Sequence, residues 1–453
     1  MNRTDDYIDK NKDRFLEELM LFLEIHSVSA DKKSEAALTR CAKYVKDLLR
    51  KAGCDKTELY STSGWPLVFG EKIIDTNKPT VLVYGHYDVQ PAAPLSLWES
   101  EPFNPVIRNG KIFARGASDD KGQIFIQIKA LEAMIKTDNL PCNVKFIIEG
   151  EEETGSQSLL DFLENNSEKL SADVVLVSDT AMISLDCPSI ETALRGMVYM
   201  QVAITGPDRD LHSGVYGGAV ANPVNILCEM ISSLHDANNR ITIPGFYDQV
   251  ISIPEKERAK INQAPFSLEA YKKELGISEV NGEKGYTTLE RVGIRPSLDV
   301  NGIWGGYTGE GAKTVLPSKA FAKISIRTVP DQHSMEIATL FSTHLKKIAP
   351  PSVHVKVDFI HGGEAAITPT DSKGYRAAAK AVKHTFGKDP LAIYSGGSIP
   401  IVPAFKKILG IDTVLLGFGL DNDNIHSPNE KMDLANFYKG IHTIPYFYQY
   451  FAD

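Results

Sequence analysis

The chain has 453 residues, of which 49 are Lys or Arg and 58 are Asp or Glu, so its net charge near neutral pH is −9. A hydrophobic fraction of 43% allows large buried cores and argues against a disordered chain. The acidic balance disfavours nucleic acid and anionic membrane surfaces as partners, and the sequence has no apolar stretch long enough to cross a bilayer.

The cysteines and the N-terminal residues indicate the compartment. Five cysteines are scattered along the chain and never form a Cys-x-x-Cys motif. This usage fits a reducing compartment and argues against a disulfide framework or a thiolate zinc site. The first fifteen residues are polar and charged and lack the apolar segment of a signal peptide. We therefore expect a soluble, cytoplasmic protein.

Helical and strand patterns alternate along the first half of the chain. Apolar residues recur at helical spacing over 15–23 and 38–49, and a buried strand is predicted over 80–84. A helix is then predicted near 121–136, a strand over 143–148, a helix near 156–170 and a strand over 173–177. Alternation of this kind predicts a mostly parallel sheet with helices on both faces.

After about residue 193 the pattern changes. Apolar residues alternate over 198–204, 322–326 and 353–359, which predicts half-exposed strands, and helices are predicted near 219–235 and 331–348. The segment 241–311 is rich in Gly, Pro and Lys and is predicted to be irregular. A helix over 373–386 and a buried strand over 414–417 resume the first pattern. The chain is thus predicted to form an α/β domain in two parts, 1–193 and 368–453, with an α+β domain inserted at 194–367.

Four short segments carry carboxylates or histidine, and three of them directly follow a predicted strand. Ligands bind at the carboxyl ends of strands in α/β sheets, and imidazole and carboxylate are good ligands for a divalent metal such as zinc. Each motif alone fits an ordinary loop, turn or helix start, but four in order favour a metal site. The segments are GHYD at 85–88, SDDKG at 118–122, EGEEETG at 149–155 and SDT at 178–180.

Longer motifs make the chain resemble the aminoacylase/carnosinase family of co-catalytic di-zinc metallopeptidases, and within it the cytosolic nonspecific dipeptidase and carnosinase branch. The resemblance implies a discontinuous phosphorylase/hydrolase-like α/β catalytic domain and an inserted α+β lid domain that forms a homodimer. The motifs run in the family's order over nearly the whole chain: GHYDVQP at 85–91, ARGASDDKGQ at 114–123, EGEEETGS at 149–156, SDT at 178–180, HSGVYGG at 212–218, IRTVP at 326–330, GGSIP at 396–400 and HSP at 426–428.

The resemblance also implies the metal ligands. His86, Asp119 and Asp179 would hold one ion, and Asp119 would bridge to a second ion held by Glu153 and His426. Composition alone would make His426 a surface-loop histidine. Zinc is the expected metal, with manganese and cobalt as alternatives because they share these ligand types.

The remaining roles come from the same resemblance. Glu152 would be the general base that deprotonates the water between the metals and later protonates the leaving amine, and Asp88 would orient His86. His212 of the partner subunit would stabilise the oxyanion. Arg327 and Ser398 would bind the C-terminal carboxylate of the substrate. A cis peptide bond between Asp119 and Asp120 is also implied.

The expected activity is metal-dependent hydrolysis of dipeptides or very short peptides. An N-acyl amino acid deacylase or a carboxypeptidase of the same fold stays open, because the motifs separate these activities poorly. An inactive metal-carrying binding protein is the alternative in a different class. A two-carboxylate glycosidase has no need for the histidines.

Overall fold

The structure is a computed structural model that describes residues 2–453, and the chain divides into two compact units. Unit 1 runs to Thr192 and continues over Thr368–Ile393 and Ile401–Asp453. Unit 2 comprises Ala193–Ile367 and the short segment Tyr394–Pro400. This second entry of the chain into unit 2 differs from the predicted division, which assigned all of 368–453 to the catalytic part. The roles expected for the two parts stay predictions.

Unit 1 is built on a mixed sheet. Its central strands β6, β3, β7 and β18 are parallel, whereas β1, β2 and β9 add antiparallel pairs on either side. The predicted parallel sheet therefore exists only in the middle. In spatial order these strands are β1 (Lys56–Tyr60), β2 (Leu67–Lys72), β6 (Asn143–Glu149), β3 (Thr80–His86), β7 (Val174–Val177), β18 (Thr413–Leu415) and β9 (Ser189–Leu194). Two further short strands, β16 (Ala366–Ile367) and β17 (Leu391–Tyr394), also pair with β9.

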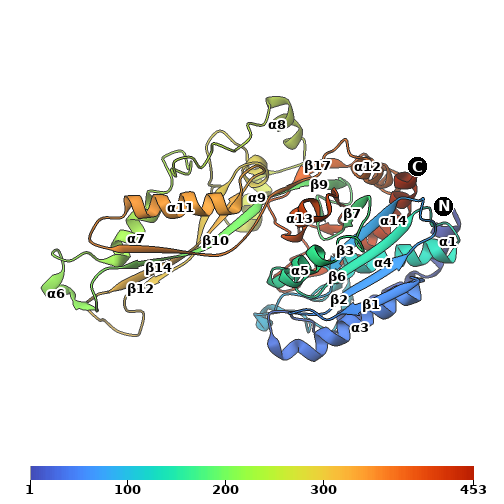
Figure 1. Ribbon diagram of the computed structural model, residues 1–453, viewed down its shortest axis with the longest axis horizontal. Helices are drawn as coiled ribbons and strands as arrows, with labels where there is room; N and C mark the ends of the chain where they lie inside the picture. Colours follow the sequence, from blue (N-terminus) through green and yellow to red (C-terminus); the bar gives the residue numbers. More distant parts are fainter. Residues whose placement is uncertain (1) are drawn as a thin grey trace. The chain divides into compact units, whose positions relative to one another are not determined.

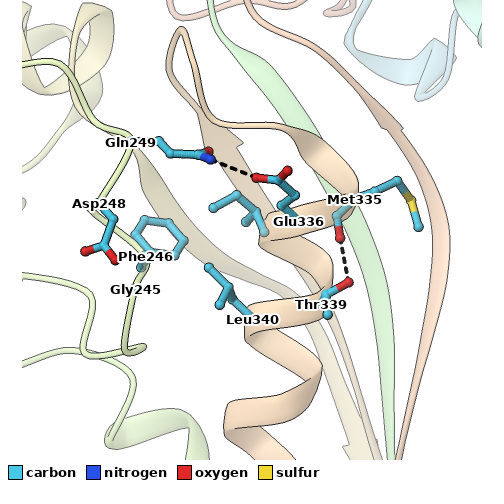
Figure 2. A pocket seen from close by; sticks show the side chains of 9 residues that line it. Gly245, Phe246, Asp248, Gln249, Met335, Glu336, Thr339 and Leu340 are labelled. Carbon is cyan, nitrogen blue, oxygen red and sulfur yellow. Dashed lines mark hydrogen bonds between the residues drawn. The ribbon is translucent and has the colours of Figure 1, made fainter.

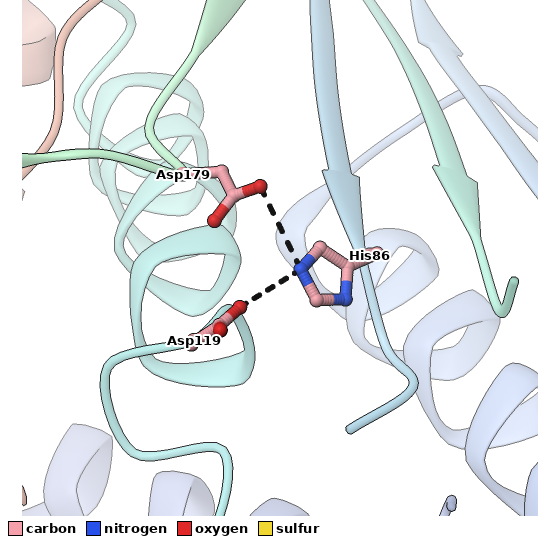
Figure 3. A group of neighbouring side chains, drawn as sticks. All are labelled: His86, Asp119 and Asp179. Atoms are coloured by element: carbon pink, nitrogen blue, oxygen red, sulfur yellow. Dashed lines mark hydrogen bonds and ion pairs between the residues drawn. The ribbon is translucent and has the colours of Figure 1, made fainter. Parts of the chain in front are cut away.

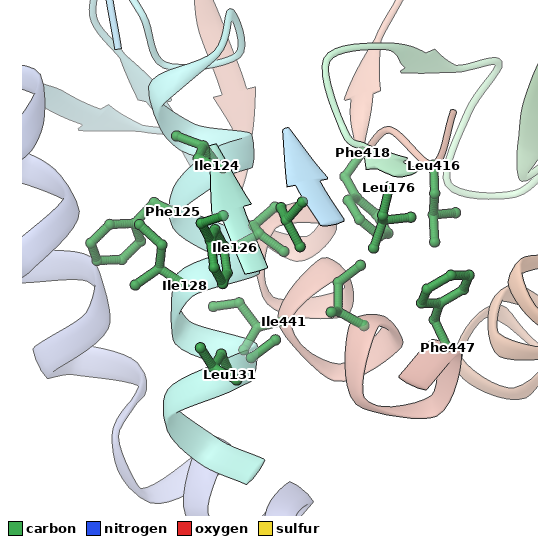
Figure 4. Packing of buried hydrophobic residues seen from close by; sticks show 14 of the residues in the cluster. Ile124, Phe125, Ile126, Ile128, Leu131, Leu176, Leu416, Phe418, Ile441 and Phe447 are labelled. Carbon is green, nitrogen blue, oxygen red and sulfur yellow. The ribbon is translucent and has the colours of Figure 1, made fainter. Parts of the chain in front are cut away.

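The core of unit 1 lies around helix α4 (Lys121–Lys136), which is buried along nearly its whole length. Apolar side chains of α4 and of α14 (Leu434–Ala452) lie beside those of β7 (Figure 4), and the rings of Phe125 and Phe437 stack with centroids 6.2 Å apart. Each such buried side chain contributes about 1.5–3 kcal/mol. The other helices of unit 1 are α1 (Asn2–Lys10), α2 (Lys12–Leu23), α3 (Glu35–Ala52), α5 (Gln157–Asn165), α12 (Lys373–Phe386) and α13 (Ile401–Ala404).

The two ends of the described chain meet in unit 1 (Figure 1). His442 of α14 lies with Nδ1 3.0 Å from Asp5 Oδ1 of α1, and Tyr446 donates to the other carboxylate oxygen at 2.9 Å. Helix α1 is mostly polar, so the spacing of apolar residues does not predict it. No helix within residues 2–453 combines the length and hydropathy needed to cross a membrane.

Unit 2 contains a four-stranded antiparallel sheet, as the alternating pattern predicts. Alternate residues of β10 (Gly196–Thr205) are buried, and Val198, Met200 and Val202 form a core with helices α7 (Pro223–Ser232) and α11 (Ser334–Ile348). Asn222 caps α7 by accepting a hydrogen bond from the backbone N–H of Val224. The strand order is β12 (Ser297–Gly305), β14 (Lys319–Thr328), β10 (Gly196–Thr205) and β15 (His354–Gly363).

The segment 241–311 is more regular than predicted. It contains helices α8 (Glu255–Ile261), α9 (Leu268–Leu275) and α10 (Thr288–Gly293) as well as the edge strand β12. Most residues of β12 are exposed or half-exposed, and its pairing with β14 is irregular between Val300 and Gly302. Neither feature produces the apolar alternation by which a strand is recognised in a sequence.

Candidate metal centre

Parallel strands bring the acidic motifs to one edge of the sheet. β3 pairs with β6 on one side and with β7 on the other, so their carboxyl ends lie together. His86 ends β3, Glu152 and Glu153 begin a short turn after β6, and Asp179 follows β7. Asp119 lies two residues before α4. The expected cis peptide bond between Asp119 and Asp120 is present.

One group of candidate ligands consists of His86, Asp119 and Asp179 (Figure 3). His86 Nε2 lies 3.1 Å from Asp119 Oδ1 and 3.7 Å from Asp179 Oδ2. One ligand atom from each residue lies within 4.8 Å of the others. The imidazole is fully buried, so its ring nitrogen is presented to these two carboxylates and not to solvent.

A second group consists of Asp119, Glu153 and His426. His426 Nε2 lies 2.8 Å from Asp119 Oδ2 and 3.3 Å from Glu153 Oε2. Asp119 therefore directs one oxygen at each histidine and belongs to both groups. A carboxylate shared in this way is what a two-metal site requires, because the ions lie about 3.5–4 Å apart and need a common ligand.

Asp88 connects the strand that carries His86 with the turn that carries the glutamates. Its carboxylate lies 3.3 Å from His86 Nδ1 and accepts hydrogen bonds from the backbone N–H groups of Glu152 and Glu153 at 3.3 and 3.1 Å. It is completely buried. The structure thus brings Asp88 beside the ring that it was expected to orient, and it also ties Glu152 and Glu153 to β3.

Glu430 supports the site and was not singled out in the sequence. Its buried carboxylate accepts hydrogen bonds from the backbone N–H groups of Gly116, Ser118 and Asp119 at 3.0–3.1 Å, and it pairs with Arg115 at 2.5 Å. It therefore joins the loop of His426 to the loop of Asp119. The sequence hardly indicates this role of Glu430, because a single glutamate in a polar loop is ordinarily exposed.

Burial and mutual repulsion dominate the electrostatics of the cluster. Burial raises the pKa of Glu152 well above its ordinary value, and the charges of Asp179 and Glu153 raise it further. Burial also raises the pKa of Asp179 to about 6, against the opposing effect of His86. Hydrogen bonds to Asp119 and Glu153 raise the pKa of His426 to about 10. Glu152 and Asp179 therefore need positive charge beside them to stay ionised.

The donor set fits two divalent cations. Asp119, Asp179 and Glu153 of the two groups, together with Glu152 beside them, would carry four negative charges when ionised, which two divalent ions would balance. Within the described part of the chain Glu153 Oε1 is buried without a hydrogen-bond partner, although buried carboxylate oxygens are normally satisfied. Oxygen and imidazole ligands suit zinc, manganese and cobalt.

The three remaining candidate residues belong to unit 2. Arg327 of β14 donates from Nη1 to Ser398 Oγ at 2.9 Å, so the structure brings these two together. Ser398 Oγ in turn donates to the carbonyl of Arg195. His212 lies elsewhere in this unit, on β11 (Leu211–His212) opposite Val315, where its Nδ1 accepts from the N–H of Gly214 at 3.1 Å.

A separate cavity of about 520 Å³ lies beside the start of α11 (Figure 2). Gln249 Nε2 donates to Glu336 Oε2 at 2.9 Å at its rim. Its lining holds two carboxylates but no imidazole, so it lacks the mixed ligand set of unit 1. The lining residues are Gly245, Phe246, Asp248, Gln249, Met335, Glu336, Ile337, Thr339 and Leu340.

Known proteins resemble the chain over nearly its whole length. Residues 82–449 match the family model described as Peptidase family M20/M25/M40. The chain is 35% identical to the Cys-Gly metallodipeptidase DUG1 of Candida albicans, over 99% of this chain and 96% of that protein. It is 31% identical to the Beta-Ala-His dipeptidase of Homo sapiens, over 98% of this chain and 91% of that protein.

Solved structures agree with these matches. The di-peptidase Dug1p of Saccharomyces cerevisiae has a TM-score of 0.86 at 33% identity, with 100% of this chain and 98% of that chain covered. The M20 family metallo-carboxypeptidase Sso-CP2 of Sulfolobus solfataricus has a TM-score of 0.87 at 35% identity, with 96% and 99% covered. The expected fold class is thereby confirmed.

Proposed function

The chain belongs to peptidase family M20/M25/M40, and we propose that it is a metal-dependent dipeptidase in which the two residue groups sharing Asp119 hold two divalent ions. The observation that carries the proposal is that Asp119 directs one carboxylate oxygen at His86 and the other at His426. The relatives named as dipeptidases support the substrate class. Zinc is the proposed metal, with manganese or cobalt as alternatives.

The chemistry is divided between the metals and the chain. When bound, the two ions lower the pKa of a water towards about 7 and polarise the carbonyl of the scissile bond. Glu152 is half-buried beside the ligand groups and belongs to neither of them, which leaves its carboxylate free to accept the proton of the attacking water. Glu152 then delivers that proton to the nitrogen of the leaving amine as the C–N bond breaks.

The residues of unit 2 are proposed to recognise the substrate. The guanidinium of Arg327 suits the C-terminal carboxylate of a short peptide, because it presents two parallel N–H donors. We further propose that the protein is a cytoplasmic homodimer in which His212 of the partner subunit stabilises the oxyanion. The five free cysteines support a reducing compartment.

Metal removal tests the proposal. Exhaustive treatment with EDTA should abolish the release of free amino acids from a panel of dipeptides, and Zn²⁺ or Mn²⁺ should restore it, because the ligand groups hold the required ions. Release would be measured by chromatography, with elemental analysis of the same samples. Full turnover by protein free of transition metals would refute the metal-dependent mechanism. Negligible turnover by metal-loaded protein on every dipeptide would favour the inactive binding protein.

A carboxypeptidase acting on longer chains is the second candidate. It is favoured by the likeness to Sso-CP2, which is 35% identical and is described as a metallo-carboxypeptidase. Comparing kcat/KM for dipeptides, tripeptides and N-acetyl amino acids on one preparation separates the activities. The dipeptidase proposal expects the highest value for dipeptides, whereas a preference for acetylated amino acids would indicate a deacylase.

A further inference from the structure

Arg195 lies between β9 and β10, next to the residues expected to bind the substrate carboxylate. The antiparallel register pairs Gly196 with Thr328 and Met197 with Arg327, so Arg195 and Arg327 lie at the same end of the sheet. The backbone here is tightly packed, because a Cβ on Gly196 would lie 2.3 Å from Thr328 Oγ1 and 2.7 Å from the carbonyl oxygen of Gly363. The backbone from which the Arg195 side chain extends is therefore held in one position.

Arg195 holds the turn 396–398 through both its backbone and its side chain. Its backbone N–H donates to the carbonyl of Gly397 at 3.0 Å, and its Nε donates to the carbonyl of Gly396 at 3.2 Å. Its own carbonyl accepts the hydroxyl proton of Ser398, whose oxygen accepts a hydrogen bond from Arg327. The Ser398 hydroxyl is thereby engaged on both sides, so its action on a substrate carboxylate would run through the orientation of Arg327.

The two guanidinium groups carry positive charge that is little compensated. In the part of the chain that the structure describes, neither forms an ion pair with a carboxylate, and Asp299 is the acid whose charge acts on both. Burial and then the charge of Arg327 lower the pKa of Arg195 to about 10. Two neighbouring cations in a half-buried place attract an anion.

We infer that Arg195 is a positioning residue for the carboxylate end of the substrate: its side chain fixes the Gly396–Ser398 turn, Ser398 orients Arg327, and its charge raises the local attraction for a carboxylate. This inference rests on the proposed function, in which Arg327 binds that carboxylate. It adds a residue that need not touch the substrate.

The surroundings of Arg195 supply a matched control. Arg195 lines a cavity of about 410 Å³ together with Arg291 and Arg295. Arg291 donates from Nε to the carbonyl of Glu283 at 3.0 Å and makes no hydrogen bond to the turn 396–398 within residues 2–453. Arg291→Met therefore removes an equal charge from the same cavity without touching the turn.

The test compares a dipeptide with its C-terminal amide, which lacks the carboxylate charge. For Arg195→Met we expect KM for the free dipeptide to rise about tenfold or more, because a misplaced Arg327 would lose the equivalent of one charge-assisted contact to the carboxylate. Its KM for the amide and both kcat values should change less than about threefold. Arg195→Lys keeps the charge and should recover part of the loss. Arg291→Met removes charge without disturbing the turn and should raise KM for the free dipeptide by less than about threefold.

Several outcomes overturn the inference. The inference is wrong if Arg195→Met has an unchanged KM for the free dipeptide. It is also wrong if KM rises equally for the dipeptide and for its amide, because that would indicate a merely structural role. If Arg195→Met does not fold, Arg195→Lys carries the test, since it cannot reproduce the planar fork and should raise KM for the free dipeptide alone. If wild-type protein cleaves no dipeptide, the proposed function fails and this inference falls with it.

Discussion

At the residue scale, the main feature of the site is that two neighbouring glutamates have different positions relative to the candidate ligand groups. Glu153 lies in a ligand group with Asp119 and His426, whereas Glu152 is in neither group. The backbone N–H groups of both are held by Asp88. One turn thus presents the proposed ligand and the proposed base from adjacent positions.

Glu152→Gln should lower kcat by about 10²–10⁴-fold, because it removes the proton acceptor while keeping the size of the side chain. Metal content by elemental analysis should stay at the wild-type value, since Glu152 is not among the proposed ligands. The matched control is Glu151→Gln. Glu151 accepts from the backbone N–H of Ser158 at 3.3 Å and lies outside both ligand groups, so its kcat should change less than about threefold. Loss of metal in the Glu152 variant would contradict the assignment.

The sequence predicted some residues of the site better than others. Imidazole and carboxylate directly after predicted strands singled out the segments of His86 and Asp179, whereas Asp119 lies in the one acidic segment that precedes a helix, and the ligand set itself came from the family resemblance. His426 was found only through the family resemblance, since it lies in a polar loop far along the chain and more than half of its side chain is exposed. Glu430 and Arg195 were missed because their contacts join segments distant in sequence.

At the element scale, two loops are joined by one buried carboxylate. Glu430 belongs to the loop that carries His426, and its three backbone hydrogen bonds reach the loop that carries Asp119. We therefore expect the placement of the candidate ligands Asp119 and His426 relative to each other to depend on this contact.

Glu430→Ala should lower the free energy of unfolding by about 3–5 kcal/mol, because it leaves the buried guanidinium of Arg115 without its partner. Urea unfolding of metal-free protein would measure this, so that lost metal binding does not enter the comparison. Glu101→Ala serves as control, since Glu101 is exposed and should change stability by less than about 0.5 kcal/mol. A loss below about 1 kcal/mol for Glu430→Ala would show that the loops are held by other contacts.

Helices and strands could be predicted from the sequence where their buried apolar residues recur at regular spacing. The predicted helices over 121–136 and 373–386 agree with α4 and α12, because apolar spacing and the residues that begin and end a helix are local signals. The antiparallel strands that flank the parallel centre were not predicted, since pairing direction depends on residues far apart in sequence. The exposed strand β12 was missed because its register irregularity interrupts any alternation.

At the scale of the whole molecule, the proposed use of His212 of the partner subunit can be tested by complementation. His212→Ala and Glu152→Gln should each be nearly inactive. Mixed under conditions that exchange subunits, they should recover about a quarter of wild-type activity, because half of the dimers are mixed and each mixed dimer has one complete site.

Activity measured before and after mixing, with the oligomeric state followed by analytical ultracentrifugation, decides the question. No recovery in mixed dimers would mean that the histidine acts within its own chain or not at all. A monomer that retains full activity would exclude the proposed dimer as a requirement for catalysis. Mixing either variant with itself is the control.

The close packing of carboxylates around Asp119 should affect how fast the protein is degraded in a cell. Without bound cations, the folded chain must keep the buried Asp119 next to the half-buried Glu152 and Asp179, which favours opening of unit 1. Cations that bind only the folded form oppose that opening by mass action. The rate of proteolysis increases with the fraction of opened chains. We therefore expect the cellular abundance of this protein to fall when the supply of the divalent metal falls.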